Sequence, residues 1–201
     1  MAIKQMSKDE FIRKILDKER DFSGIKLYDF NLSDHEAFNE LQSYLKQQNL
    51  KEEPIIIEGS DLRYIRAEGL YLPYVKAKKA KLLDAHIWGA QLWNADFEYA
   101  DLEKADLWRS DLRCANLERS ILRDADISMA NLWKARLGYS NLIKADLRCA
   151  ILREADLKNA EISLADFRSA DIEGAEFSKI DFISAPTLKE SANLGKVILP
   201  Q

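Results

Sequence analysis

The side chains best suited to catalysis or metal binding in this sequence are two histidines and two cysteines: His35, His86, Cys114 and Cys149. A nucleophilic enzyme needs a base next to its serine or cysteine, and a metal site needs ligands at short, matched spacings. Neither pattern is present, because the two cysteines stand 35 positions apart. The seven glycines form no phosphate-binding loop. We therefore expect no enzymatic activity, no cofactor and no metal, and both cysteines are expected to be free thiols.

Tryptophan and arginine side chains offer a different kind of chemistry, the binding of other proteins. A large flat apolar ring beside a fixed positive charge is the combination most often found at binding hot spots. The chain has four tryptophans, and two arginines lie close to them in the sequence. Whether these side chains share one surface depends on the elements that position them.

An apolar residue recurs at every fifth position through most of the chain, for example at Leu107, Leu112 and Leu117. From Ile55 to Ser184 this pattern makes 26 consecutive units, and the residue two positions before each apolar centre is nearly always Ala or Ser. An α-helix would turn about 500° in five residues, and a straight strand would turn successive centres to opposite faces. A period of five keeps the centres on one side only if the chain turns a corner in every unit. The sequence therefore predicts a coil whose stacked turns pair their backbones about 4.8 Å apart.

The repeated unit resembles the consensus A(D/N)LXX of the pentapeptide repeat family. The units that carry the resemblance are ADLEK, ADLWR, ANLER, ADISM, ANLWK, ADLRC, ADLKN and ADFRS. The resemblance implies a right-handed quadrilateral β-helix with four units, hence 20 residues, in each coil. It also implies that the apolar centre and the small residue two positions before it point inward. The expected fold class is an all-β solenoid with short capping helices and one helical insertion.

Three further units, centred on Phe22, Leu27 and Leu32, precede the main run. They complete a first coil if Ile57 supplies its fourth side, and residues from about 35 to 54 are then expected to loop out as a helical insertion. Whether this insertion covers the flank of the coil or binds a partner is left open by the sequence.

The ends of a solenoid expose unpaired backbone and therefore need caps. We expect three parts: residues 1–19 as an N-terminal capping helix, residues 20–184 as the β-helix with its insertion, and residues 185–201 as a C-terminal cap. Each expected helix begins with a capping-box pattern, and the pairs are Ser7 with Glu10, Ser33 with Glu36, and Thr187 with Glu190. The first helix is expected from about Lys8 to Glu19, with Phe11, Ile12 and Ile15 on its apolar face. The apolar face of the inserted helix consists of Ala37, Phe38, Leu41, Tyr44 and Leu45.

Residues 20 positions apart stack on one face of such a coil, so the sequence maps onto a surface. The aromatic columns are Trp88 and Trp108; Trp93, Arg113, Trp133 and Arg153; and Tyr99, Arg119 and Tyr139. In the last two columns we expect the guanidinium groups to lie between aromatic faces. Each tryptophan directly follows an inward centre and should face solvent. The predicted interaction surface consists of Trp88, Trp93, Trp108, Arg109, Arg113 and Trp133, although a role limited to stacking between coils stays open.

The functional hypothesis is a non-enzymatic scaffold that binds another protein through its flat faces. The partner is not specified by the sequence, and a second copy of the chain, giving a homodimer, is one candidate. The resemblance implies an alternative, because some members of the family mimic a DNA duplex and bind DNA gyrase in its place. Phosphates would then be imitated by a stacked column of carboxylates: Asp106, Asp126, Asp146 and Asp166. The simpler interpretation is that these carboxylates hydrogen-bond the turns, and it is favoured by Arg148 and Arg168 beside two of them.

Charge and hydropathy indicate which classes of partner and which cellular location to expect. The chain has 30 basic and 34 acidic residues, mixed along its length, for a net charge of −4. This balance argues against direct binding to nucleic acid, which favours a basic excess. The sequence has no apolar run long enough to cross a membrane and no signal peptide. We expect a cytoplasmic protein that does not bind membranes.

Overall fold

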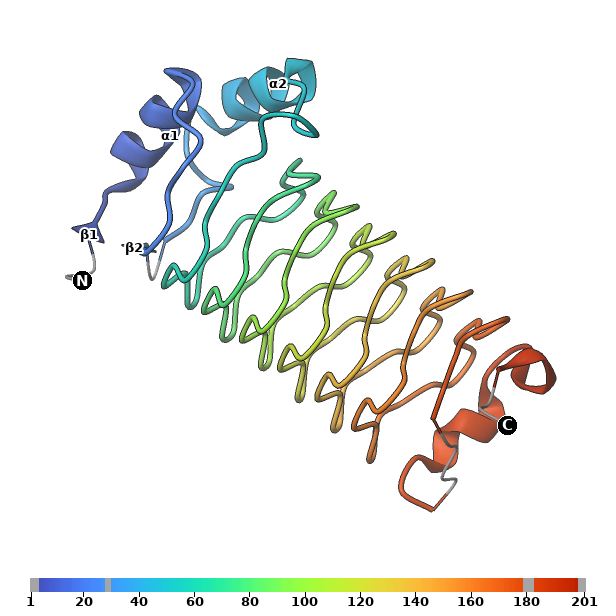
Figure 1. The fold of residues 1–201 in the computed structure, drawn as a ribbon. Coiled ribbons are helices and arrows are strands. Elements are labelled where there is room, and N and C mark those ends of the chain that lie inside the picture. The colour runs from blue at the N-terminus through green and yellow to red at the C-terminus, as the bar shows by residue number, and fades with distance from the viewer. Residues whose placement is uncertain (1–3, 28–29, 179–182, 199–201) are drawn as a thin grey trace.

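Coils of 20 residues stack along the protein in the computed structural model, which describes residues 4–27, 30–178 and 183–198 (Figure 1). Parallel backbone bridges join positions 20 apart, without interruption, from Ile56 and Lys76 to Asp156 and Glu176. Each coil has four such bridges to the next coil. The predicted period of 20 residues is therefore confirmed over this stretch, and residues of one column lie side by side on one face.

The interior of the coil is filled by the apolar centres and the small residues that precede them. Leu107, Ile127 and Leu147 have no exposed surface, and Ala105 and Ala125 are also buried. These inward positions are as predicted. The final predicted unit, centred on Phe182, lies outside the described residues.

In the units centred from Ile57 to Ile172, the chain turns its corner at the residue two positions after the centre, which adopts a left-handed backbone. The φ angle is 58° at Lys104 and 55° at Arg109, a conformation that costs a non-glycine residue about 1–2 kcal/mol. Where Asp or Asn precedes the centre, its side chain can accept a hydrogen bond that stabilises the turn. For example, Oδ1 of Asp106 accepts a hydrogen bond from the backbone N–H of Trp108 at 3.1 Å.

Helix α1 (Lys8–Leu16) lies at the N-terminal end of the coil (Figure 1). Ser7 is its N-cap, and Ser7 Oγ accepts a hydrogen bond from the N–H of Glu10 at 3.2 Å. The helix ends three residues before Glu19, where the sequence had placed its end. Its buried residues are those predicted: Phe11, Ile12 and Ile15.

The first coil has only three repeat units, and the prediction that Ile57 forms its fourth side is wrong. The bridges from this coil to the next span 35 residues instead of 20, and they join Asp21 to Ile56, Lys26 to Asp61, and Asn31 to Arg66. Ile57 therefore belongs to the second coil and occupies the same face as Phe22. On its other side the first coil pairs through strand β2 (Ile25–Lys26), which is parallel to strand β1 (Lys4–Gln5).

Helix α2 (Phe38–Gln47) takes the place of the missing fourth side. Gln42 Oε1 accepts a hydrogen bond from the backbone N–H of Tyr71 at 2.8 Å. One coil further on, the backbone N–H of Gln91 donates a hydrogen bond to the carbonyl of Leu70 at 2.9 Å. A side-chain amide of α2 thus supplies the acceptor that a preceding coil would supply elsewhere.

The apolar face predicted for α2 is confirmed, with Leu41 and Leu45 buried and its other members packed against the core: Ala37, Phe38 and Tyr44. The predicted capping box of Ser33 and Glu36 is wrong. The N-cap is Ala37, without a side-chain hydrogen bond. The hydroxyl of Ser33 donates instead to the carboxylate of Glu68 in the next coil.

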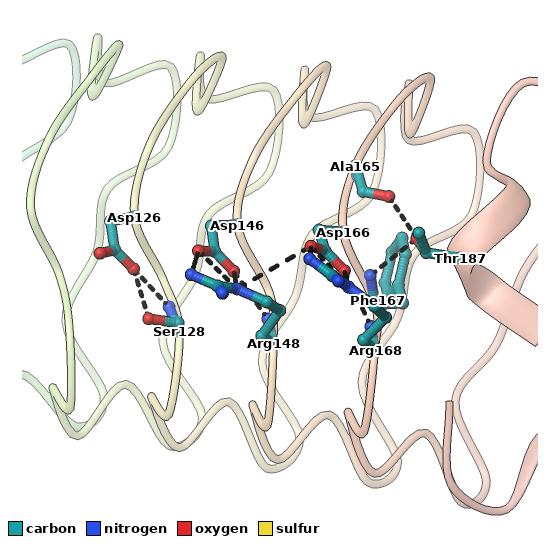
Figure 2. A network of polar contacts seen from close by, with 9 residues as sticks. All are labelled: Asp126, Ser128, Asp146, Arg148, Ala165, Asp166, Phe167, Arg168 and Thr187. Carbon is teal, nitrogen blue, oxygen red and sulfur yellow. Dashed lines mark hydrogen bonds and ion pairs between the residues drawn. The ribbon is translucent and has the colours of Figure 1, made fainter. Parts of the chain in front are cut away.

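Two short 3₁₀ helices, η1 (Pro186–Glu190) and η2 (Leu194–Lys196), follow the coils. The predicted capping box at Thr187 does not form. Its hydroxyl oxygen accepts a hydrogen bond from the N–H of Phe167 at 3.0 Å, and the hydroxyl donates to the carbonyl of Ala165 at 2.8 Å (Figure 2). Thr187 thus takes part in the ladder of the last coils. The three-part division of the chain into caps and β-helix stays a prediction.

Candidate protein-binding surface

The four tryptophans lie on two adjoining faces of the coil. Face 1 is the side whose inward residues include Leu107, and face 2 is the side whose inward residues include Leu112; Arg109 turns the corner between them. Trp88 and Trp108 lie on face 1, and Trp93 and Trp133 lie on face 2. Each follows a fully or largely buried centre, and the exposed fractions reach 41% for Trp88 and 36% for Trp133. All four therefore project outward.

The tryptophans of face 1 form a stacked pair with Arg109. The ring centroids of Trp88 and Trp108 are 6.0 Å apart with the planes tilted by 60°. The guanidinium carbon of Arg109 lies 4.3 Å from the ring centroid of Trp108. Among the described residues, Arg109 has no ion pair with a carboxylate. The contact that the structure gives its guanidinium is with the indole ring of Trp108.

The column on face 2 differs from the expectation, because Arg113 does not lie between the indoles. Its Nε and a terminal nitrogen donate to the two carboxylate oxygens of Asp111, at 2.8 and 2.6 Å. This ion pair also raises the pKa of Arg113. A bidentate hydrogen bond from a guanidinium to a carboxylate is stronger than an exposed contact of the guanidinium with an aromatic ring. Trp133 is contacted by Lys134 instead, whose ammonium lies 4.5 Å from the ring centroid.

Because Arg113 is folded against Asp111, an open groove of about 310 Å³ remains between Trp93 and Trp133. The groove is also lined by Asn94 and Cys114. Both of these residues were missing from the predicted surface. The 20-residue register could have identified them, since they occupy the corner column next to the tryptophans.

The third aromatic column has the predicted arrangement. The guanidinium carbon of Arg119 lies 5.6 Å from the ring centroid of Tyr99 and 5.1 Å from that of Tyr139. Among the described residues, Arg119 forms no ion pair with a carboxylate within 4.0 Å, and its guanidinium lies near both rings. This column is a cation–π stack across three coils.

The aspartate column on face 1 serves the turns of the coil (Figure 2). Oδ1 of each aspartate accepts a hydrogen bond from the N–H two residues later, at 2.9 to 3.1 Å, for Asp106, Asp126, Asp146 and Asp166. Arg148 and Arg168 also fold back onto the carboxylates of Asp146 and Asp166. These contacts agree with the simpler interpretation of the column.

The carboxyl groups at the two ends of the aspartate column have pKa values shifted in opposite directions. Burial raises the pKa of Asp106, and the neighbouring carboxylate of Asp126 adds to that rise. At the other end, the hydrogen bond from the Arg168 side chain lowers the pKa of Asp166. Negative charge is therefore disfavoured at one end of the column and neutralised by arginine at the other.

The histidines and cysteines do not converge in space. His35 Nε2 lies 2.8 Å from Oδ1 of Asp9, and His35 Nδ1 accepts the N–H of Ala37. Cys114 and Cys149 are free thiols. In the described part of the chain, no three His, Cys, Asp or Glu residues are grouped to hold a metal ion. Over the same residues, every helix is too short or too polar to cross a membrane.

Solved structures with a similar fold include two pentapeptide repeat proteins. HetL, involved in heterocyst differentiation regulation in the cyanobacterium Nostoc sp. strain PCC 7120, matches with a TM-score of 0.62 and 23% identity over 86% of this chain and 81% of its own. QnrB1, a plasmid-mediated fluoroquinolone resistance protein, matches with a TM-score of 0.54 and 20% identity over 73% of this chain and 82% of its own. At these identities the likeness concerns the fold alone. None of the curated proteins matches the sequence.

The sequence model of the family described as pentapeptide repeats matches eight copies in overlapping segments. The segments are residues 75–113, 90–128, 100–137, 128–163 and 153–182. They cover more than half of the chain and coincide with the stacked coils. The chain belongs to the pentapeptide repeat family.

Proposed function

We propose that this chain is a non-catalytic scaffold that binds a protein partner through its tryptophan surface. The tryptophan surface is defined as Trp88, Trp93, Trp108, Arg109, Arg113 and Trp133. The observation that carries the proposal is the open groove between Trp93 and Trp133. Exposed indoles that flank a groove beside a charged corner combine the apolar area and fixed charge typical of binding hot spots.

A stabilising role alone explains these tryptophans less well. The Tyr99–Arg119–Tyr139 stack already shows how an aromatic column contributes contacts between coils. On face 2 Arg113 is bonded to Asp111, and it lines an open groove together with the indoles of Trp93 and Trp133. Leaving apolar rings in water is unfavourable, so a partner that covers them gains free energy.

A DNA-mimic inhibitor of DNA gyrase is the alternative function. QnrB1 shares the fold with this chain, which is consistent with that alternative. The aspartate column favours it less, because Asp146 and Asp166 are bonded by arginines and cannot present the free charge of phosphates. A supercoiling assay with purified gyrase tests it, and we expect no inhibition at micromolar protein.

Two finer expectations belong to the same proposal. We expect the coil to be right-handed, as the family resemblance implies, and the protein to act in the cytoplasm. An experimental structure tests the first, and fractionation of cells that produce the protein tests the second.

The tryptophan surface is tested by replacing its four indoles together. The variant Trp88→Ala/Trp93→Ala/Trp108→Ala/Trp133→Ala is compared with wild type for mass in solution and for proteins captured from a lysate. A matched control is Tyr99→Ala/Tyr139→Ala, which removes exposed rings from another part of the coil. We expect the tryptophan variant, and not the tyrosine variant, to lose its partner or its self-association. If mass and captured proteins are the same for all three proteins, the proposed function is wrong.

A further inference from the structure

We propose that the tryptophan surface binds a proline-rich segment in the polyproline II conformation, lying along face 2 parallel to the axis of the coil, with an acidic residue next to its prolines. This inference rests on the proposed function and specifies the class of partner. It is carried by the spacing of the indoles, the open groove between them, and the unpaired charge of Arg109.

The spacing of the indoles matches the pitch of a polyproline II helix. Trp93 and Trp133 occupy the same column and are two coils apart, which corresponds to about 9.6 Å at a strand spacing of about 4.8 Å. A polyproline II helix rises about 3.1 Å per residue with three residues per turn, or about 9.3 Å per turn. In a ligand parallel to the coil axis, side chains three residues apart therefore have nearly the same spacing as residues of one column two coils apart.

Arg113 and Arg153, the arginines of this column, are each bonded to a carboxylate, and their side chains remain about half exposed. Arg113 is held against Asp111. Two coils further on, Arg153 is held by Glu173, with 2.7 Å between the guanidinium and the carboxylate. Face 2 thus alternates between an aromatic ring and an ion-paired arginine, with the same two-coil period. Known grooves for polyproline II segments are likewise lined by aromatic rings.

The lining of the groove suits a backbone without internal hydrogen bonds. A polyproline II segment leaves its carbonyl groups free to accept bonds. Among the described contacts, no acceptor engages the indole N–H of Trp93 or the side-chain amide of Asn94, and Asn94 is exposed. Both can donate to ligand carbonyls. The groove volume of about 310 Å³ is at the lower end for ligand pockets, which suits a short stretch of peptide.

The charge of the surface indicates which residue should accompany the prolines. Arg113 and Arg153 are neutralised by their carboxylates, and Lys134 pairs with Glu154 at 3.3 Å. Arg109, at the corner between face 1 and face 2, stacks on Trp108 and has no carboxylate partner among the described residues. An Asp or Glu in the ligand complements this charge.

The test is a fluorescence titration with synthetic peptides, which uses the indoles as reporters. The probes are a peptide of nine prolines, the same peptide preceded by two aspartates, and a Gly/Ser peptide of equal length that has no preferred conformation. We expect saturable binding of both proline peptides, with the Gly/Ser peptide at least tenfold weaker. Equal affinity for the Gly/Ser peptide, or no saturable binding of either proline peptide, would overturn the inference.

Variants assign the binding to this surface. Trp93→Ala and Trp133→Ala are each expected to weaken binding of the proline peptides at least tenfold. Tyr139→Ala, which removes a more exposed ring elsewhere on the coil, should change it less than twofold. Arg109→Glu should weaken the aspartate-containing peptide at least fivefold more than the uncharged one. Thermal melts of all variants verify folding, and a correctly folded Trp93→Ala protein that binds as wild type does would refute the inference.

The peptide titration and the comparison of mass and captured proteins distinguish a failure of the polyproline inference from a failure of the proposed function. If the proline peptides do not bind but the four-tryptophan variant loses a partner or dissociates from a dimer, the polyproline inference is wrong and the proposed function stands. If the four-tryptophan variant also keeps its mass and its captured proteins, both are wrong.

Discussion

The inward positions of the repeat carry apolar side chains or small serines whose hydroxyls bond the backbone. Leu112 and Leu132 have no exposed surface, and the residue two positions before each of them is the small Ser110 or Ala130 because the interior is narrow. No water reaches this interior to solvate a charge. The outward positions one residue away, by contrast, carry charged and aromatic side chains.

Leu112→Asp is expected to destabilise the protein by about 4 kcal/mol or more, since it places an unpaired charge in an apolar interior. The matched control is Ile151→Asp, an outward position on face 2 with 40% exposure, which should change stability by less than about 1 kcal/mol. Urea unfolding followed by circular dichroism measures both. Equal stability of the two variants would show that the inward register is misassigned.

The aspartate column allows a second test at the scale of single residues. The raised pKa of Asp106 means that its ionisation costs folding free energy once the pH exceeds its ordinary value of 3.8. Asp106→Asn keeps the oxygen that accepts the Trp108 N–H, so we expect it to stabilise the protein at pH 7 by about 0.5 kcal/mol. The gain should disappear as the pH falls below 3.8.

At Asp166 we expect ionisation to stabilise the folded protein, because the hydrogen bond from Arg168 lowers the pKa of this carboxyl. Its contribution is present above the ordinary value of 3.8 and is lost as the pH falls through the lower value in the folded protein. Asp166→Asn should therefore reduce stability at pH 7, by less than about 1 kcal/mol because the pair is partly exposed. Melting curves of both Asn variants from pH 2.5 to 7 test the two signs, and a shift in the same direction for both would contradict this assignment.

At the scale of elements, α2 completes the first coil through one side-chain amide. Gln42 is buried, and its oxygen is the acceptor for the Tyr71 N–H at the edge of the second coil. Gln42→Leu keeps the volume but removes this acceptor, so the amide is left without a partner. A buried donor without a partner costs about 1–3 kcal/mol.

We expect Gln42→Leu to lower stability by about 1 kcal/mol and to speed hydrogen exchange at the Tyr71 amide. The loss is at the low end because the Tyr71 N–H is only partly buried and because the substitution also removes the Gln42 side-chain nitrogen, which is buried without a partner among the described residues. Gln42→Glu keeps an acceptor oxygen and serves as the control for that amide. Amides of the central coils, such as that of Leu117, should keep their protection. Unchanged exchange at Tyr71 in the leucine variant would show that α2 does not pair with the coil in this way.

The whole molecule is a stack of coils in which each coil pairs with the coil before it and the coil after it. Ion pairs follow the same rule, joining Lys78 to Glu98 at 2.8 Å and Arg123 to Glu103 at 2.5 Å, each across one coil step. In such an array, stability is close to a sum of terms for coils and for the interfaces between adjacent coils. Removing one complete coil should therefore leave the rest intact.

Deleting residues 135–154, one coil of 20 residues, is expected to give a folded protein with an unchanged circular dichroism spectrum per residue and a lower melting temperature. Deleting residues 135–152 removes two residues fewer and interrupts the five-residue period. That deletion moves outward residues to inward positions and should prevent cooperative folding. Comparable melting of the two deletion variants would argue against the coil register.

The sequence by itself determined the coil and the inward positions, because a period of five is compatible with neither a helix nor a straight strand. The 20-residue period was implied by the resemblance to the pentapeptide repeat family, and the backbone bridges between positions 20 apart confirmed it. The sequence also identified the apolar faces of both helices. Only the tertiary structure placed α2 on the fourth side of the first coil, since that position depends on which backbone groups the three-unit coil leaves unpaired. The groove on face 2 was likewise decided in three dimensions. Arg113 had two possible partners within reach, and the carboxylate of Asp111 bonds it more strongly than the indoles of Trp93 and Trp133 do.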